Sequence, residues 1–282
     1  MNTRPLELAH EFELTDAEFK RLRELVHART GIALSEAKRE LVYGRLARRL
    51  RKLKLSSFAE YCRLVESPES AELQELTNAI TTNLTSFFRE NHHFEQLSVE
   101  ALPQIVTERS ATRRMRLWSA GCSTGEEPYS LAVVLREALA RLPNWDIKVL
   151  ATDIDSKVVA TAAEGVYAAD RLKGVSPERV RNWFPPVAGR PGFCAASAEL
   201  KGLITFKQLN LLESWPMKGP FDIIFCRNVV IYFDKATQRE LFDRMADLQE
   251  PGAWLFIGHS ENLLNVTPRY KLVGRTVYRR AE

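Results

Sequence analysis

Residues 115–131 read MRLWSAGCSTGEEPYSL, an apolar segment followed by a turn with two glycines and then by the start of a helical pattern. This pattern predicts a strand over residues 115–120, a turn over residues 121–125 and a helix over residues 126–141. Ligands of open parallel sheets bind at the carboxyl ends of the strands, where small residues let them approach the backbone. The stretch therefore indicates a ligand-binding α/β domain.

The segments around this stretch repeat its alternation of strand and helix. Further strands are predicted over residues 147–152, 221–226, 253–257, 270–273 and 276–278, and helices over residues 93–106, 156–163 and 236–248. Such alternation is typical of a mostly parallel sheet with helices on both faces, a Rossmann-like arrangement. Residues 181–206, which contain several prolines and glycines, interrupt it, and we expect a small antiparallel β insertion there.

The N-terminal part of the chain has only helical patterns, so we expect an all-α domain over residues 1–83 before the α/β domain of residues 84–282. Thr15 and Glu18 form a capping-box pattern before the first helix. A second helix, over about residues 36–54, has one apolar arc and a separate cationic arc. The cationic arc consists of Lys38, Arg45, Arg48, Arg49 and Lys52.

Composition sets limits on the function. Lys and Arg number 40 against 36 Asp and Glu among 282 residues, and the resulting net charge of +4 is too small to specify a polyanionic partner. The start of the chain has no signal-peptide pattern and no segment is apolar enough for a membrane span, so we expect a cytoplasmic protein without direct membrane insertion. The four cysteines and the histidines lack metal-site spacing, which predicts reduced thiols and no metal.

Two glutamates follow the glycine-containing turn where a phosphate-binding loop would have glycine or lysine. Glu126 and Glu127 would repel a phosphate and attract a cation or hydroxyl groups. Alternatively, both carboxylates serve only to complement the dipole of the helix that they begin. The residues alone leave both interpretations open.

A further acidic pair, Asp153 and Asp155, follows the second predicted strand. A carboxylate at this strand end can accept the ribose hydroxyls of an adenosine, although Asp155 or Ser156 could simply cap the next helix. We assign Asp153 to the ribose and Asp155 to the cap. An adenosine-bearing cofactor with a positive centre and no phosphate is S-adenosylmethionine, which the turn fits better than a nicotinamide dinucleotide.

Five blocks of sequence extend this interpretation to a family. They are TTNLTSFFRE at 81–90, WSAGCSTGEEPYS at 118–130, ATDID at 151–155, FDIIFCRNVVIYF at 221–233 and GHSEN at 258–262. In this order the blocks resemble those of the bacterial chemoreceptor glutamate methyltransferases, the CheR family. The N-terminal helical pattern is also similar to that family's first domain, so the resemblance covers nearly the whole chain.

The resemblance implies a set of cofactor contacts and catalytic residues. The implied cofactor is S-adenosylmethionine and the implied product S-adenosylhomocysteine. The residues that the resemblance implies as cofactor contacts are Asn83, Thr85, Arg89, Glu127, Asp153, Asn210, Leu211, Arg227 and Asn228. Arg89 could hold the cofactor's carboxylate as a bidentate pair, or form a surface ion pair with Glu90 or Glu95. Tyr232 would orient the acceptor near the reacting methyl group, or else be a packing aromatic. We expect catalytic roles for Tyr232 and Arg89.

The resemblance also implies the reaction and the partner. It predicts methyl transfer to glutamates on the cytoplasmic helical domain of chemoreceptors, with the cationic arc of the second helix docking an acidic surface. Two other functions are possible: an RNA methyltransferase that uses this arc to bind RNA, and a non-catalytic cofactor-binding regulator. The cationic arc could also be a charged surface that only contacts solvent. Of these we favour the receptor methyltransferase, expect no nucleic-acid partner and take a monomer as the default.

Overall fold

The computed structural model describes residues 10–67, 69–138, 140 and 144–282. The chain divides into two compact units between Thr81 and Thr82, and each unit has its own hydrophobic core. Among the described residues, no helix is both long and apolar enough to cross a membrane.

The N-terminal unit is entirely helical, as the sequence predicts. Its elements are α1 (Asp16–Thr30), the 3-10 turn η1 (Glu36–Lys38), α2 (Arg39–Leu53), α3 (Phe58–Glu66) and α4 (Glu72–Ile80). The capping box is present, because the Thr15 side chain accepts from the Glu18 N–H and the Glu18 carboxylate accepts from the Thr15 N–H. Phe19, Leu46 and Phe58 are buried in the core where these helices meet.

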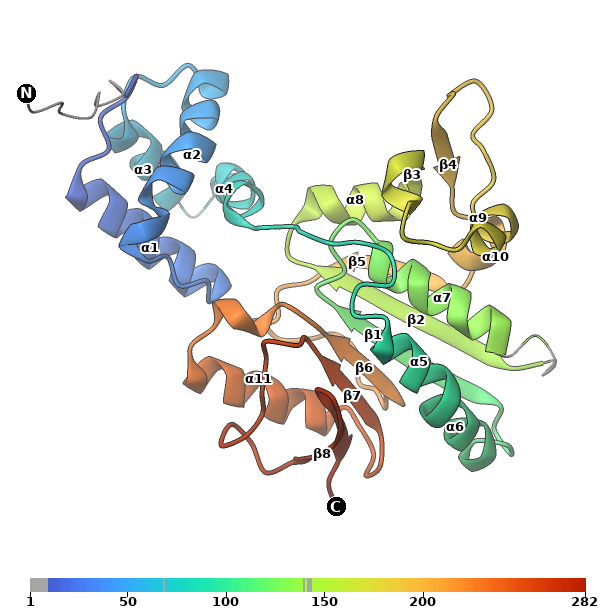
Figure 1. The fold of residues 1–282 in the computed structure, drawn as a ribbon. Coiled ribbons are helices and arrows are strands. Elements are labelled where there is room, and N and C mark those ends of the chain that lie inside the picture. Colours follow the sequence, from blue (N-terminus) through green and yellow to red (C-terminus); the bar gives the residue numbers. More distant parts are fainter. Residues whose placement is uncertain (1–9, 68, 139, 141–143) are drawn as a thin grey trace, which may run out of the picture. The chain divides into compact units, whose positions relative to one another are not determined.

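The second unit is built on a seven-stranded sheet (Figure 1). In spatial order its strands are β5 (Ile204–Gln208), β2 (Asp146–Asp153), β1 (Arg114–Ala120), β6 (Ile223–Cys226), β7 (Trp254–Ile257), β9 (Val277–Arg280) and β8 (Tyr270–Gly274). Every pairing from β5 to β7 is parallel, whereas β9 pairs antiparallel with both β7 and β8. This confirms the mostly parallel sheet.

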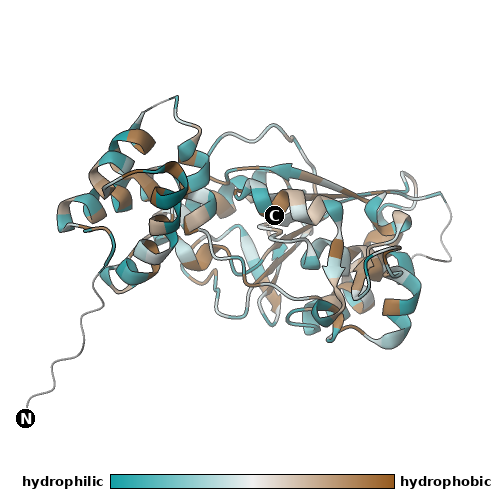
Figure 2. Cartoon of the chain, turned by 90° about the horizontal axis from the view of Figure 1, so that it is seen from above, coloured by the Kyte–Doolittle hydropathy of each residue, from teal (hydrophilic) through white to brown (hydrophobic). Residues whose placement is uncertain are grey.

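Helices cover both faces of this sheet. On one face lie α5 (His92–Gln96), the π-helical turn η2 (Leu97–Ala101), α6 (Leu102–Glu108) and α7 (Glu126–Ala138), and on the other lies α11 (Lys235–Asp247) (Figure 1). Side chains alternate between the faces along each strand, so Met115 and Leu117 join the first core, while Trp118 and Ala120 join the second. In Figure 2, hydrophobic and hydrophilic residues alternate along the helices.

The antiparallel insertion is present but begins earlier than residues 181–206. It pairs β3 (Val166–Ala168), which follows α8 (Ser156–Glu164), with β4 (Phe193–Ala195), and η3 (Ala169–Leu172) and α9 (Pro177–Trp183) lie between them. After α10 (Ala198–Lys201), residues 204–208 form β5 of the main sheet. Three-residue strands are too short to produce a periodicity, and β5 is a largely exposed edge strand without an apolar run.

Candidate active site

A buried arginine lies at the centre of the site. Arg227 follows β6, and its side chain is 2% exposed. Nη1 lies 3.1 Å from Oε2 of Glu127, at the start of α7, and Nη2 lies 3.3 Å from Oε2 of Glu90, just before α5. The guanidinium also lies over the ring of Phe94, 5.6 Å from its centroid. One cation therefore faces two carboxylates in a poorly solvated place.

Glu127 has a second partner that the sequence did not suggest. The hydroxyl of Ser119, on β1, donates to Glu127 Oε1 at 2.7 Å. Burial raises the pKa of Glu127, although Arg227 and the Ser119 hydrogen bond oppose the change. The hydroxyl and the guanidinium thus fix a carboxylate at the carboxyl end of the sheet, where it can receive a cationic group of a ligand.

Glu90 connects three segments that are distant in sequence. Its Oε1 accepts from His259 Nδ1 at 2.8 Å and from Asn228 Nδ2 at 3.3 Å, and its Oε2 accepts from the His259 N–H at 3.1 Å. Burial alone would raise the pKa of Glu90, but His259 and the charge of Arg227 outweigh it and lower the pKa to about 2. We call Arg227, Glu127, Glu90, Asn228 and His259 the Arg227 cluster.

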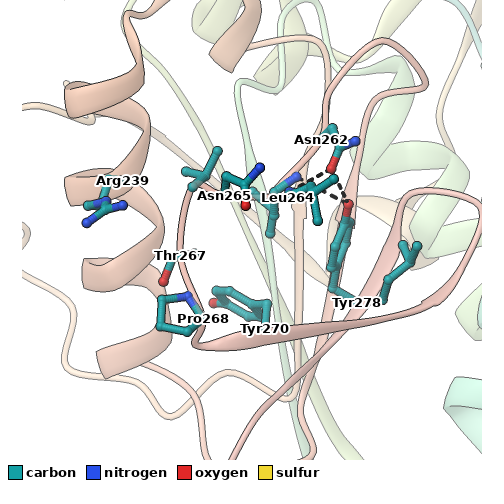
Figure 3. Close-up of a pocket in the computed structure, with 11 residues that line it drawn as sticks. Arg239, Asn262, Leu264, Asn265, Thr267, Pro268, Tyr270 and Tyr278 are labelled. Carbon is teal, nitrogen blue, oxygen red and sulfur yellow. Dashed lines mark hydrogen bonds between the residues drawn. The ribbon is translucent and has the colours of Figure 1, made fainter.

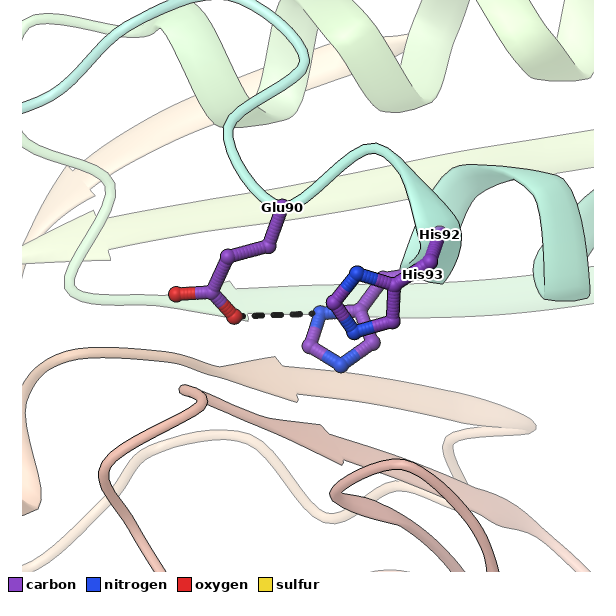
Figure 4. A group of neighbouring side chains, drawn as sticks. All are labelled: Glu90, His92 and His93. Atoms are coloured by element: carbon purple, nitrogen blue, oxygen red, sulfur yellow. Dashed lines mark ion pairs between the residues drawn. The ribbon is translucent and has the colours of Figure 1, made fainter.

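Figure 4 shows Glu90 beside His92 and His93, whose ligand-type atoms all lie within 4.8 Å of one another. His93 Nδ1 is 3.5 Å from Glu90, and its Nε2 lies 3.1 Å from the carbonyl oxygen of Arg275. Burial and the charge of Arg227 lower the pKa of His93 to about 4, so the ring is neutral near pH 7. Because the Glu90 oxygens already accept from several donors, this group is better suited to connecting the chain segments than to binding a metal.

Asp153 lies at the end of β2, next to the glycine-containing turn. Oδ2 accepts from the Ser123 N–H at 2.8 Å and Oδ1 from the Asp155 N–H at 3.0 Å. Burial raises the pKa of Asp153 despite these hydrogen bonds. Asp155 caps α8 by accepting from the N–H groups of Lys157 and Val158, which confirms the predicted cap.

The turn itself is shaped for close approach. A Cβ on Gly121, whose φ is +89°, would lie 2.3 Å from a methyl carbon of Val229, so only glycine fits against that loop. Ser123 has a left-handed φ of 48°, and its buried hydroxyl has no hydrogen-bond partner among the described residues. A ligand with hydroxyl or amide groups would supply the missing hydrogen bond of this hydroxyl beside Asp153, so these residues fit a nucleoside.

The predicted contacts between residues 83 and 89 lie in one loop. Asn83 Nδ2 donates to Asp155 at 2.9 Å. The Thr85 carbonyl accepts from Arg171 at 3.4 Å. Arg89 Nη1 donates to the Leu84 carbonyl at 2.9 Å. Within the described part of the chain, no ion pair joins Arg89 to Glu90 or Glu95, which leaves its other donors available to a ligand.

Both glutamates of the turn have specific partners, so they do more than complement a helix dipole. Glu126 is fully buried, accepts from the Thr124 hydroxyl at 2.6 Å and pairs with Arg171 of the insertion. Glu127 belongs to the Arg227 cluster instead. The two neighbouring carboxylates therefore point to different surroundings.

Asn210 and Leu211 follow β5, whose end lies beside that of β2. The Leu209 N–H donates to the Asp153 carbonyl at 2.9 Å, which joins the two strand ends. Asn210 accepts from the Leu212 N–H at 3.0 Å and forms a local turn. Asn210 and Leu211 thus come directly after the residue that joins the end of β5 to Asp153, and their role as cofactor contacts stays a prediction.

Glu261 is a buried residue that the sequence interpretation missed. Its carboxylate accepts from the N–H groups of Asn228 and Val230, both at 2.9 Å, and so fixes the loop after β6. Asn228 has a left-handed φ of 59°, and Tyr232 follows as the half-buried last residue of η4 (Val230–Tyr232). In the sequence, only the GHSEN block pointed to Glu261. A local sequence pattern cannot show that a carboxylate accepts hydrogen bonds from N–H groups of a distant loop.

The cationic arc of α2 is divided between internal and exposed positions. Arg45 Nη1 donates to the Ile80 carbonyl at 2.7 Å and so caps α4. Arg49 makes a bidentate pair with buried Glu72 at 2.8 and 2.6 Å. Arg48 and Lys52 are exposed, while Lys38 is half-buried in η1. Part of the predicted docking set thus holds the N-terminal unit together, because α2 packs on α4 through that face.

Comparison with known families accounts for nearly the whole chain. Residues 83–279 match the family described as "CheR methyltransferase, SAM binding domain". Residues 17–81 match "CheR methyltransferase, all-alpha domain". The two matches meet where the structure separates its two units.

Several curated proteins are similar to this chain over almost their full length. The "Chemotaxis protein methyltransferase" of Salmonella typhimurium is 44% identical over 97% of this chain and 93% of its own length. That of Escherichia coli is 43% identical over 97% of this chain and 94% of its own length. "Chemotaxis protein methyltransferase 2" of Pseudomonas aeruginosa is 45% identical, with 95% and 94% covered.

Proposed function

The chain belongs to the CheR family of methyltransferases, and we propose that it transfers the methyl group of S-adenosylmethionine to glutamate side chains of chemoreceptors. The products would be glutamate methyl esters and S-adenosylhomocysteine. The observation that carries the proposal is the Arg227 cluster. It lies at the carboxyl ends of the parallel strands in a chain whose relatives are named chemotaxis protein methyltransferases.

The cofactor assignment rests on two groups of side chains. Asp153 and the unpaired Ser123 hydroxyl are suited to ribose hydroxyls, with Asn83, Thr85, Asn210 and Leu211 around the adenosine. The carboxylate of Glu127 is suited to an ammonium group, and the free donors of Arg89 to a carboxylate. When bound, S-adenosylmethionine supplies an electrophilic methyl group on a sulfonium sulfur.

The residues of the chain have an orienting task rather than an acid-base task. A glutamate carboxylate has an ordinary pKa near 4.3 and is already an anion at neutral pH, so the acceptor needs no strong base. Arg227 is paired with Glu127 and Glu90 and holds the turn after β6, so Asn228 and Tyr232 are the residues that can position the acceptor carboxylate. Rate enhancement then comes from alignment and removal of water.

The partner assignment rests on family membership and on surface charge. Arg48 and Lys52 of the cationic arc are exposed and can attract an acidic receptor surface, while Arg45 and Arg49 support the same helix and Lys38 is half-buried beside its start. We place the reaction in the cytoplasm, where the relatives' named process would require the enzyme. No observation favours RNA as the acceptor or a regulator without catalysis.

Methyl-transfer assays test the proposal directly. The protein is incubated with methyl-labelled S-adenosylmethionine and either receptor cytoplasmic fragments or structured RNA. We expect label in the receptor fragment that mild alkali releases, because esters hydrolyse under these conditions. Label in RNA, or no transfer to any receptor fragment, would contradict the proposal.

A further inference from the structure

A pocket of about 600 Å³ opens between α11, β8 and the loop after β7 (Figure 3). Its lining includes Arg239, Asn262, Leu263, Leu264 and Leu272. Among the residues assigned to the reaction, none lines it. The pocket is therefore distinct from the Arg227 cluster and from Asp153.

The pocket is apolar and open, with a single charge. Leu264 is 74% exposed and Leu272 is 63% exposed, and both line the same pocket, so they present apolar surface to solvent at one place, as interaction sites do. Arg239 is the only charged residue of the lining, and no ion pair involving it occurs among the described residues. An occupant that complements this surface combines an apolar group with an anionic one.

The wall of the pocket continues into the active site. Asn262 and Leu263 directly follow Glu261, whose carboxylate accepts from the N–H groups of Asn228 and Val230. The segment that lines the pocket is thus the same loop that fixes the catalytic turn after β6. A protein held at the turn after β6 and an occupant of the pocket would thus contact parts of one loop.

The edge of the sheet argues against an added strand as the occupant. β8 is the outermost strand, but it carries exposed Lys271 and an irregular register between Leu272 and Gly274. Lysine and bulges are features by which edge strands resist pairing with another chain. The occupant is then expected to contact side chains, as an amphipathic helix does in a groove.

We propose that this pocket is a second contact site for the methyl-accepting protein, which seats an apolar side chain between Leu264 and Leu272 and an acidic side chain against Arg239. The occupant is an amphipathic, acidic helical segment of the same protein that carries the acceptor glutamate. This inference rests on the proposed function. It adds a binding determinant that takes no part in the chemistry.

Steady-state methylation of a receptor cytoplasmic fragment tests the contact site in the full-length protein. Leu264→Ser/Leu272→Ser and Arg239→Glu change exposed side chains and should leave folding intact. We expect each to raise the KM for the fragment by about tenfold, with kcat and the Kd for S-adenosylmethionine unchanged. The matched control is Val99→Ser, which changes a 74% exposed apolar residue in η2 and should alter nothing.

A second substrate separates docking from chemistry. With a short peptide that contains only the acceptor glutamate and its immediate neighbours, the variants should match the wild type. An unchanged KM for the fragment would overturn the contact site, and so would a change of oligomeric state in the leucine variant, which would indicate self-association. Absence of methyl transfer by the wild type would instead overturn the proposed function.

Discussion

Arg227 Nη1 lies 3.1 Å from Glu127 Oε2, and the two side chains are only 2% and 12% exposed. Because Glu90 also faces Arg227, this small region holds two carboxylates against one guanidinium. The excess of negative charge fits a ligand that carries an ammonium and a sulfonium centre, and low solvent exposure strengthens the attraction. This relationship connects the charge pattern of the site to the choice of cofactor.

Glu127→Gln should weaken S-adenosylmethionine binding about tenfold to a hundredfold, because a neutral amide loses the charge-assisted contact. Folding should persist, since Arg227 keeps Glu90 as a partner. Isothermal calorimetry measures the affinity. Glu137→Gln, which changes the exposed end of the same helix, should bind normally. Unchanged affinity in Glu127→Gln would remove the ammonium assignment.

Asp153→Ala should weaken cofactor binding by about 1–3 kcal/mol, the cost of leaving polar partners without a hydrogen bond. The variant loses hydrogen bonds to the ribose hydroxyls. The difference in affinity between wild type and variant should therefore be smaller for a deoxyribose analogue of S-adenosylhomocysteine than for S-adenosylhomocysteine itself. Equal affinity of both proteins for S-adenosylhomocysteine itself would exclude Asp153 as a ribose ligand.

His93 gives a prediction on the dependence of stability on pH. Burial lowers the pKa of its ring to about 4 in the folded protein, against an ordinary value of 6.5. The unfolded chain therefore binds the proton more readily, and the free energy of unfolding should fall as pH drops from 6.5 towards 4. Over the first part of that window, from pH 6.5 to pH 5, this single group accounts for about 1.5 kcal/mol.

Urea unfolding of His93→Gln at several pH values measures this contribution. The variant should lose about 1.5 kcal/mol less than the wild type between pH 6.5 and pH 5, because glutamine does not titrate. His27→Gln, which removes an exposed histidine of α1, serves as the control and should behave like the wild type. Identical curves for all three proteins would show that His93 is not held neutral.

The cationic arc predicts two separate effects. Arg48→Glu/Lys52→Glu should raise the KM for a receptor fragment at low salt and leave stability unchanged. At high salt the increase in KM should disappear, because salt screens the charges.

Arg49→Gln should instead destabilise the N-terminal unit by about 3–5 kcal/mol, because it leaves buried Glu72 without its charged partner. Thermal unfolding and methylation assays distinguish the two. A stable Arg49→Gln protein would contradict the structural role given to that pair.

The sequence predicted those features that depend on local patterns. The strands around residues 115–131 and the cap at Asp155 follow from apolar periodicity and from one polar side chain beside a helix start. The antiparallel insertion was placed too late, because β3 and β4 have three residues each. Local patterns could not give such short pairings.

Contacts between distant segments explain what was missed in the site. Glu90 accepts from groups at residues 228 and 259, and Glu261 from N–H groups at residues 228 and 230. Likewise, Arg45 and Arg49 belong to a cationic arc in the sequence, but α4 supplies the carbonyl and carboxylate that bind them. Such partners become visible only when the chain is folded.

The most direct test of the central claim is mass spectrometry of a receptor cytoplasmic fragment after incubation with the protein and S-adenosylmethionine. We predict that each added methyl group is on a glutamate side chain and that mild alkali restores the unmodified peptide. A methyl group on a lysine or arginine nitrogen, or one that survives alkali, would contradict transfer to an ionised carboxylate.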